Sequence, residues 1–288
     1  MLHLPRDGLF VPDVKAVLDG ERFGRVALLG GIYSNYLALD RAIAMAKAQG
    51  AEAIYALGDF GAFGPHPDRT VEILRGHGIP AIQGNYEESL GSAAEDCHCG
   101  YTDPRDNHFA QISYDYTRDR TAAEHKAWMR TLPGHLRLTV GGARVLLCHG
   151  SPRTINEFLF RSNTPDAFIK KLLREADADV IACTHTGLHW DRWIEPGRGV
   201  VNVGALGRPA NDGRTNVWFA MLSAEAGAGS AGRTVKAEFV PVDYEHERLA
   251  REMRDEGLPA EFVETIESGY WTTCLEILPA KERARGRY

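Results

Sequence analysis

Residues 57–67 read LGDFGAFGPHP, and they place a carboxylate directly after an apolar run. A strand is predicted over 53–57, Asp59 follows its end, and a helix is predicted over 68–76. A strand that stops at a tight turn before a helix is where α/β proteins usually present ligand-binding groups. This stretch therefore predicts an α/β fold with a functional edge, and the other strand ends can be compared with it.

Three further apolar runs end in the same manner. Asn85 follows a strand predicted over 79–83, His149 directly follows the run VLLC, and His185 follows the run VIAC after Thr184. A single polar residue in such a place is more often a helix cap or a hydrogen-bonded bystander than a ligand. Because one carboxylate, one amide and two imidazoles occur at successive strand ends, the pattern predicts a shared site.

The order of the elements also suggests how many sheets the protein contains. The first half reads as alternating strands and helices, whereas residues 178–241 are rich in strands. Two sheets, each covered by helices on its outer face, would account for this change. Strands are predicted at 25–29, 53–57, 79–83, 136–140, 143–148, 178–183, 199–203, 216–222 and 234–241, and helices at 35–48, 68–76, 107–118, 121–131, 165–175, 243–255 and 259–267.

Composition excludes several classes of function. The 288 residues are 44% hydrophobic and 25% charged, which is typical of a soluble globular protein. A net charge of −6 without a basic block argues against a nucleic-acid partner. No apolar run approaches the ~20 residues of a membrane span. The N-terminal MLHLPRDGLFVPDVK lacks signal-peptide features, and five cysteines, an odd number, favour buried thiols, so we expect a cytoplasmic protein.

The four strand ends together resemble the calcineurin-like metallophosphoesterase superfamily, and most of all its small bacterial phosphodiesterase-type branch. LGDFGAFGPHPDRTVEIL at 57–74 and VVNVGALGRPANDGRTNVWFAML at 200–222 are similar to conserved segments of that branch. The resemblance covers residues 24–222 and implies a four-layer α/β/β/α sandwich of two mixed sheets. Residues 1–242 would form this domain, and 243–288 would be a C-terminal helical appendage that wraps it or reaches a neighbouring copy.

The resemblance also implies which residues hold metal. The family binds two metals, and the four ligands of its second metal match Asp59, Asn85, His149 and His185. Two nitrogen and two oxygen donors suit a divalent transition metal such as Mn, Fe, Zn, Ni or Co.

The ligands of the family's first metal are absent from this sequence. The Asp and His of the family's first motif match Gly31 and Tyr33, and the second His of its last motif matches Gly187. Because one complete ligand set is lost and the other is kept, we expect one metal per chain. The alternative is a decayed site in which the remaining residues only hold loops together.

Other side chains could refill the empty half. Tyr33 stands where the family has a ligand, and His189 lies four residues after His185. Cys97 and Cys99 follow the Asn85 corner, although two cysteines alone do not complete a site and could simply pack under a loop.

Two residues are candidates for assisting catalysis. Tyr86 occupies the position at which the family often has a His that protonates the leaving group. Tyrosine is a far weaker acid near neutral pH, so Tyr86 could instead stack on a base or fill space. Asn35, together with Tyr33 and the amides of the Gly30–Gly31 turn, could contact the phosphoryl oxygens in place of the missing metal.

Three functions remain open on the sequence. The first is a single-metal phosphoester hydrolase of weakened activity, phosphodiesterase- or phosphatase-like, that acts on a small phosphorylated substrate. The second is a non-catalytic or regulatory member that binds a phosphorylated ligand or partner. The third is a metal enzyme with other chemistry, such as redox chemistry at iron, on the same scaffold. The sequence leaves a homo-oligomer open as well.

Overall fold

Strands and helices alternate through the first half of the computed structural model, which describes residues 22–226 and 233–287. The first 21 residues of the predicted 1–242 domain, residues 227–232 and residue 288 lie outside the described part. The strands are β1 (Arg22–Phe23), β2 (Arg25–Leu29), β3 (Ala53–Ala56), β4 (Leu136–Val140), β5 (Ala143–Leu147), β6 (Val180–Cys183), β7 (His189–Glu195), β8 (Arg198–Val203), β9 (Val217–Ala226) and β10 (Arg233–Val242). The helices are α1 (Tyr36–Ala48), α2 (Pro67–Gly76), α3 (Asn85–Ser92), α4 (Pro104–Arg120), α5 (Ala123–Met129), α6 (Asp166–Glu175), α7 (His246–Asp255), α8 (Ala260–Ser268) and α9 (Ala280–Arg283).

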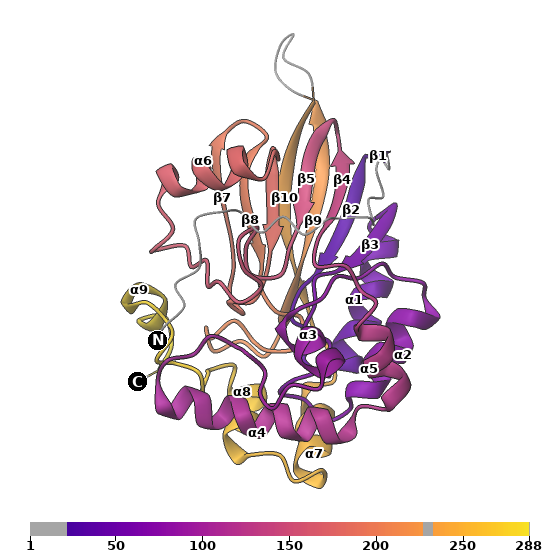
Figure 1. The fold of residues 1–288 in the computed structure, drawn as a ribbon, viewed down its shortest axis with the longest axis vertical. Helices are drawn as coiled ribbons and strands as arrows, with labels where there is room; N and C mark the ends of the chain where they lie inside the picture. Colours follow the sequence, from indigo (N-terminus) through magenta and orange to yellow (C-terminus); the bar gives the residue numbers. More distant parts are fainter. Residues whose placement is uncertain (1–21, 227–232, 288) are drawn as a thin grey trace.

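These strands form two mixed sheets (Figure 1). One sheet has the order β1-β4-β5-β6-β8-β7 and the other has the order β10-β9-β2-β3. Within them, β2 pairs with β3 in parallel, and β5, β6 and β8 are parallel neighbours. Parallel strands bring their carboxyl ends to one edge, so the loops after β3, β5 and β6 can meet.

The alternation of apolar residues along β2 explains how the layers pack. Val26 and Leu28 point to the space between the sheets, whereas Ala27 and Leu29 point to the helices on the outside. The inner cluster draws on both sheets and includes Leu57, Leu138, Val145, Val180, Val201 and Leu222. The predicted sandwich of two helix-covered sheets is therefore confirmed.

Each sheet is covered on its outer face by helices. On the six-stranded sheet, α6 buries Ile169 and Leu172 against Ile181 and Val200. On the four-stranded sheet, the buried side of α1 packs in the same cluster as Ala27 and Leu29. The amphipathic pattern of these helices thus completes the outer layers.

The C-terminal helices extend the outer cluster of the four-stranded sheet. Leu249 of α7 and Phe262 of α8 belong to the same buried cluster as α1. The Phe262 ring lies 4.8 Å from that of Phe63 and 5.9 Å from that of Phe109 on α4. Figure 1 shows α7 and α8 beside α4, below the sheets. This segment therefore packs on the domain and contributes to its core.

One predicted strand is wrong, and one helix was not predicted. Residues 79–83 form only a single bridge, between Ala56 and Ala81, because Pro80 has no amide hydrogen to donate to a ladder. The helix that was not predicted is α3, which begins at Asn85. Among the described residues, no helix is long and apolar enough to cross a bilayer.

Candidate metal centre

Three buried side chains meet at the strand ends after β3, β5 and β6. The ligand atoms of Asp59, His149 and His185 all lie within 4.8 Å of one another. His149 Nε2 lies 3.3 Å from Asp59 Oδ2 and 3.1 Å from His185 Nδ1. One carboxylate oxygen and two imidazole nitrogens at this spacing can share a single cation.

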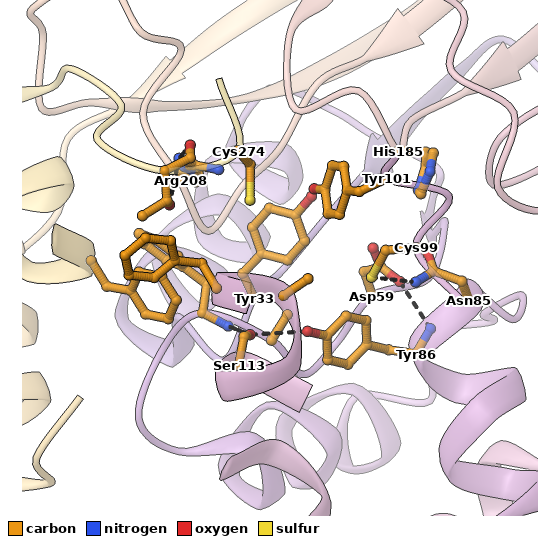
Figure 2. Close-up of a pocket in the computed structure, with 16 residues that line it drawn as sticks. Tyr33, Asp59, Asn85, Tyr86, Cys99, Tyr101, Ser113, His185, Arg208 and Cys274 are labelled. Carbon is orange, nitrogen blue, oxygen red and sulfur yellow. Dashed lines mark hydrogen bonds between the residues drawn. The ribbon is translucent and has the colours of Figure 1, made fainter. Parts of the chain in front are cut away.

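Asn85 adds a fourth donor from the first turn of α3. Its Nδ2 donates to the carbonyl oxygen of Cys97 at 2.9 Å and to Cys99 Sγ at 3.3 Å. This orientation leaves Oδ1 buried without a hydrogen-bond partner among the described residues. A buried oxygen that lacks a donor is unfavourable, so Asn85 Oδ1 is suited to a cation (Figure 2).

His149 and Asp59 form the main charge interaction within the candidate metal centre. Its Nδ1 lies 2.7 Å from the carbonyl oxygen of Leu57, which marks Nδ1 as the donor and leaves Nε2 facing Asp59. Burial lowers the pKa of His149, but the charge and hydrogen bond of Asp59, together with the carbonyl oxygen of Leu57, outweigh it and the net shift is upward. Burial raises the pKa of Asp59, but His149 reverses this and the net shift is downward. Both shifts favour a protonated His149 beside an ionised Asp59, so a cation would compete with a proton for this pair.

His185 differs from His149 in its protonation. Burial lowers the pKa of His185 to about 3, with a further contribution from the charge of His149. The ring is consequently neutral across the physiological range, which is the form that binds metal.

Glu87 holds two corners of the centre together, and the sequence analysis missed it. Its carboxylate accepts from the backbone amides of Asp59 at 2.7 Å, Phe60 at 2.9 Å and Gly84 at 2.8 Å. Burial, with the charge of Asp59 adding to it, raises the pKa of Glu87 to about 7. The detectable signal was a glutamate three residues after the N-cap Gly84, as in a capping box.

Protein side chains fill the half of the site in which the resemblance would place the family's first metal. A Cβ atom at Gly187 would lie 2.9 Å from the Trp271 ring, and one at Gly31 would lie 2.9 Å from the Tyr33 ring. Burial, and then Asp59, raise the pKa of the Tyr33 hydroxyl far above its ordinary value. Tyr33 is therefore a neutral phenol in this structure, and its role as a replacement ligand stays a prediction.

The other predicted replacement ligands, His189 and the two cysteines, lie outside the cluster of Asp59, His149 and His185. His189 lies on β7, where its ring packs 4.4 Å from that of Trp218 and 4.8 Å from that of Phe239. Cys97 and Cys99 are joined in a disulfide. The prediction that these thiols could bind metal is wrong, because the thiolate is the ligand form.

The two predicted catalytic side chains have other partners. Asn35 caps α1, with its Oδ1 accepting from the amide of Ala38 at 3.0 Å and its Nδ2 donating to Gly207 O at 3.5 Å. The hydroxyl of Tyr86 donates to Ser113 Oγ at 2.9 Å and points away from the metal cluster (Figure 2). Both groups therefore have partners within the fold, and their roles in catalysis stay predictions.

A cavity of about 60 Å³ opens beside the centre (Figure 2). Asp59, Asn85 and His185 lie at one side, and Arg208 lies at the other. Arg208 was not singled out in the sequence, because nothing in its surroundings there suggests burial. Half of the remaining lining residues are aromatic, namely Tyr33, Phe63, Tyr86, Tyr101, Phe109 and Phe262.

Comparison with known proteins agrees with this geometry. The model of the calcineurin-like phosphoesterase superfamily domain matches residues 25–227. An uncharacterised protein of Methanocaldococcus jannaschii is 26% identical over 146 residues, which is 50% of this chain but only 57% of that relative.

Two solved structures share the fold over most of the chain. A metallophosphoesterase from Sphaerobacter thermophilus has a TM-score of 0.63 at 22% identity, and a hypothetical protein from Pyrococcus horikoshii has a TM-score of 0.69 at 21% identity. Each match covers 86% of this chain and 99% of the other. The fold, the strand-end residues and the matched family model lead to one conclusion: the chain belongs to the calcineurin-like phosphoesterase superfamily.

Proposed function

We propose that this protein hydrolyses phosphoesters with one divalent transition metal. The ligands would be Asp59, Asn85, His149 and His185. The observation that carries the proposal is the contrast between the two halves of the site. One half gathers buried nitrogen and oxygen donors, including an oxygen with no other partner, whereas rings fill the other half.

The chain's own residues would prepare this centre in three ways. The carbonyl oxygen of Leu57 fixes the tautomer of His149, and Glu87 fixes the backbone of the Asp59 turn. The ring of Tyr33 closes the site on the side of the absent metal. The bound metal would supply a Lewis acid and a water of lowered pKa. Mn, Fe, Zn, Ni and Co all suit the donor set.

The expected substrate is a small phosphoester with a good leaving group. Tyr86 is held by Ser113, so no side chain that the sequence suggested as the acid is free to protonate the leaving oxygen. Cleavage would then depend on the leaving group's own acidity.

The position of Asn35 favours a second candidate function, that of a non-catalytic member that binds a phosphorylated ligand. Asn35, the predicted charge clamp, is engaged as a helix cap. If the centre holds metal and ligand without turnover, this second function is the correct one.

An assay on metal-loaded protein separates the two candidates. Aryl phosphodiesters and monoesters should be hydrolysed, and His185→Ala should lose both the metal and the activity. His189→Ala is the matched control, since it also removes an imidazole with a lowered pKa, half-buried in this case, but lies outside the cluster. A wild-type protein that holds metal yet cleaves none of these esters would refute the hydrolase proposal.

A further inference from the structure

Arg208 is a buried cation without an anionic partner. Its side chain lies in the loop after β8 and is only 7% exposed. Nη2 donates to the carbonyl oxygen of Thr273 at 2.7 Å, while Nε is buried with no hydrogen-bond partner. Among residues 22–226 and 233–287, no carboxylate forms an ion pair with it. A buried charge of this kind usually has a counter-charge, because removing it from water is unfavourable.

Contacts with aromatic rings offset only part of the cost of burying the Arg208 guanidinium. The guanidinium lies 4.0 Å from the centre of the Trp271 ring and 5.0 Å from that of Phe63. Such cation–π contacts stabilise a guanidinium less than burial destabilises it. Because Arg208 also lines the cavity, the missing anion can come from a bound ligand.

The cavity therefore has two polar ends with apolar walls between them. Figure 2 shows Arg208 on the opposite side from Asp59 and His185, with Tyr33 and Tyr101 between. The hydroxyl of Tyr33 lies close enough to both ends for their charges to affect its pKa. Asp59 raises this pKa and Arg208 lowers it, and each effect is smaller than that of burial. A ligand that satisfies both ends must carry one group for the metal and another for the arginine.

We propose that the cavity binds a small phosphoester that carries a second anionic group, with the phosphoryl group at the metal centre and the second anion on Arg208. This inference rests on the proposed metal-held phosphoryl site. A carboxylate or a second phosphate would serve equally, because the guanidinium binds the oxygens of both in the same forked geometry.

The size of the cavity limits the rest of the ligand. The cavity measures about 60 Å³ and is partly open to solvent, so a short linker would join the two anionic groups and the rest of a ligand would extend outside. Figure 2 shows Tyr33 and Tyr101 between the two ends, so the linker would pass these rings. The two charged ends supply the charge selection of the cavity.

Phosphonocarboxylates test the proposal without turnover, because their C–P bond resists hydrolysis. Phosphonoacetate, 3-phosphonopropionate and 4-phosphonobutyrate would be titrated calorimetrically into metal-loaded protein. Methyl-, ethyl- and propylphosphonate are the matched probes with a single anion. At the linker length that spans the cavity, the carboxylated probe should bind at least tenfold more tightly than its alkyl match.

Variants of Arg208 test whether this residue causes the tighter binding of the carboxylated probes. Arg208→Met should reduce the ratio of affinities to about one, and Arg208→Lys should keep part of it. Arg69→Met is the matched control, since Arg69 also stacks on a ring, that of Tyr36 at 3.7 Å, but is exposed and outside the cavity. Circular dichroism and metal analysis would accompany each titration.

Three outcomes would overturn the inference. A ratio near one at every linker length in the wild type would do so, as would a ratio that a folded Arg208→Met variant leaves unchanged. Equal loss of affinity for both probe series would place Arg208 on the phosphoryl group itself. The aryl ester assay is independent of these titrations. A protein that cleaves esters but shows no preference loses only this inference, and one that shows the preference without cleavage loses only the hydrolase proposal.

Discussion

Restoring the three absent ligands should destabilise the protein instead of recruiting a second metal. The triple variant Gly31→Asp, Tyr33→His and Gly187→His places the family's residues in the empty half. Gly31 and Gly187 have φ values of +43° and +72°, which side chains rarely adopt. At Gly187 the new Cβ would also lie 2.9 Å from Trp271.

The expected loss follows from these two effects. A left-handed conformation costs roughly 1–2 kcal/mol for each non-glycine residue, and overpacking typically costs 1–3 kcal/mol more. The variant should therefore lose about 3–7 kcal/mol of its free energy of unfolding, against a typical total of 5–15 kcal/mol. Tyr33→His alone is the control, because Tyr33 already has a positive φ of 49°.

Urea unfolding with chelator present, followed by circular dichroism, would measure this loss. Elemental analysis after reloading would count the metals. A triple variant within about 1 kcal/mol of the wild type, a shift well below the expected strain, that also holds two metals would refute the idea that protein fills this half.

Three other expectations concern the centre that is retained. Metal affinity measured by calorimetry should rise with pH until His149 has lost its proton. Because the pKa of His149 is raised, that rise should continue above pH ~6.5, the ordinary value, and a flat profile from pH ~5 to ~8 would contradict proton competition. The double variant Cys97→Ser/Cys99→Ser should keep one metal per chain by elemental analysis, and its loss would show that the sulfurs are needed. Glu87→Gln should lower the free energy of unfolding by about 1–3 kcal/mol, since a buried amide group loses its acceptor, whereas the exposed neighbour variant Glu88→Gln should leave it unchanged.

Local patterns were enough to predict the fold and the members of the cluster. Asp59, His149 and His185 each lie within three residues of the end of an apolar strand, so their place at the sheet edge depends on a few neighbouring residues. Such features are determined by residues close together in the chain, and a single sequence displays them.

The misplaced residues depend on contacts between distant segments. Tyr86 points to Ser113 on α4, 27 residues away, and no local pattern indicates that direction. Trp271 closes the empty half from 84 residues beyond Gly187, the difference between the two positions. Arg208 is buried by the same C-terminal segment, through Trp271 and Thr273. Tertiary packing decides these positions, so they could not be predicted from spacing.

Anomalous diffraction at the metal edge, from crystals of protein loaded with manganese, tests the central claim most directly. It gives the number of metals and their positions in one experiment. The account predicts one peak per chain, with Asp59, Asn85, His149 and His185 as its ligands. Two peaks about 3.5–4 Å apart, as in two-metal centres, or one peak away from these side chains, would contradict it.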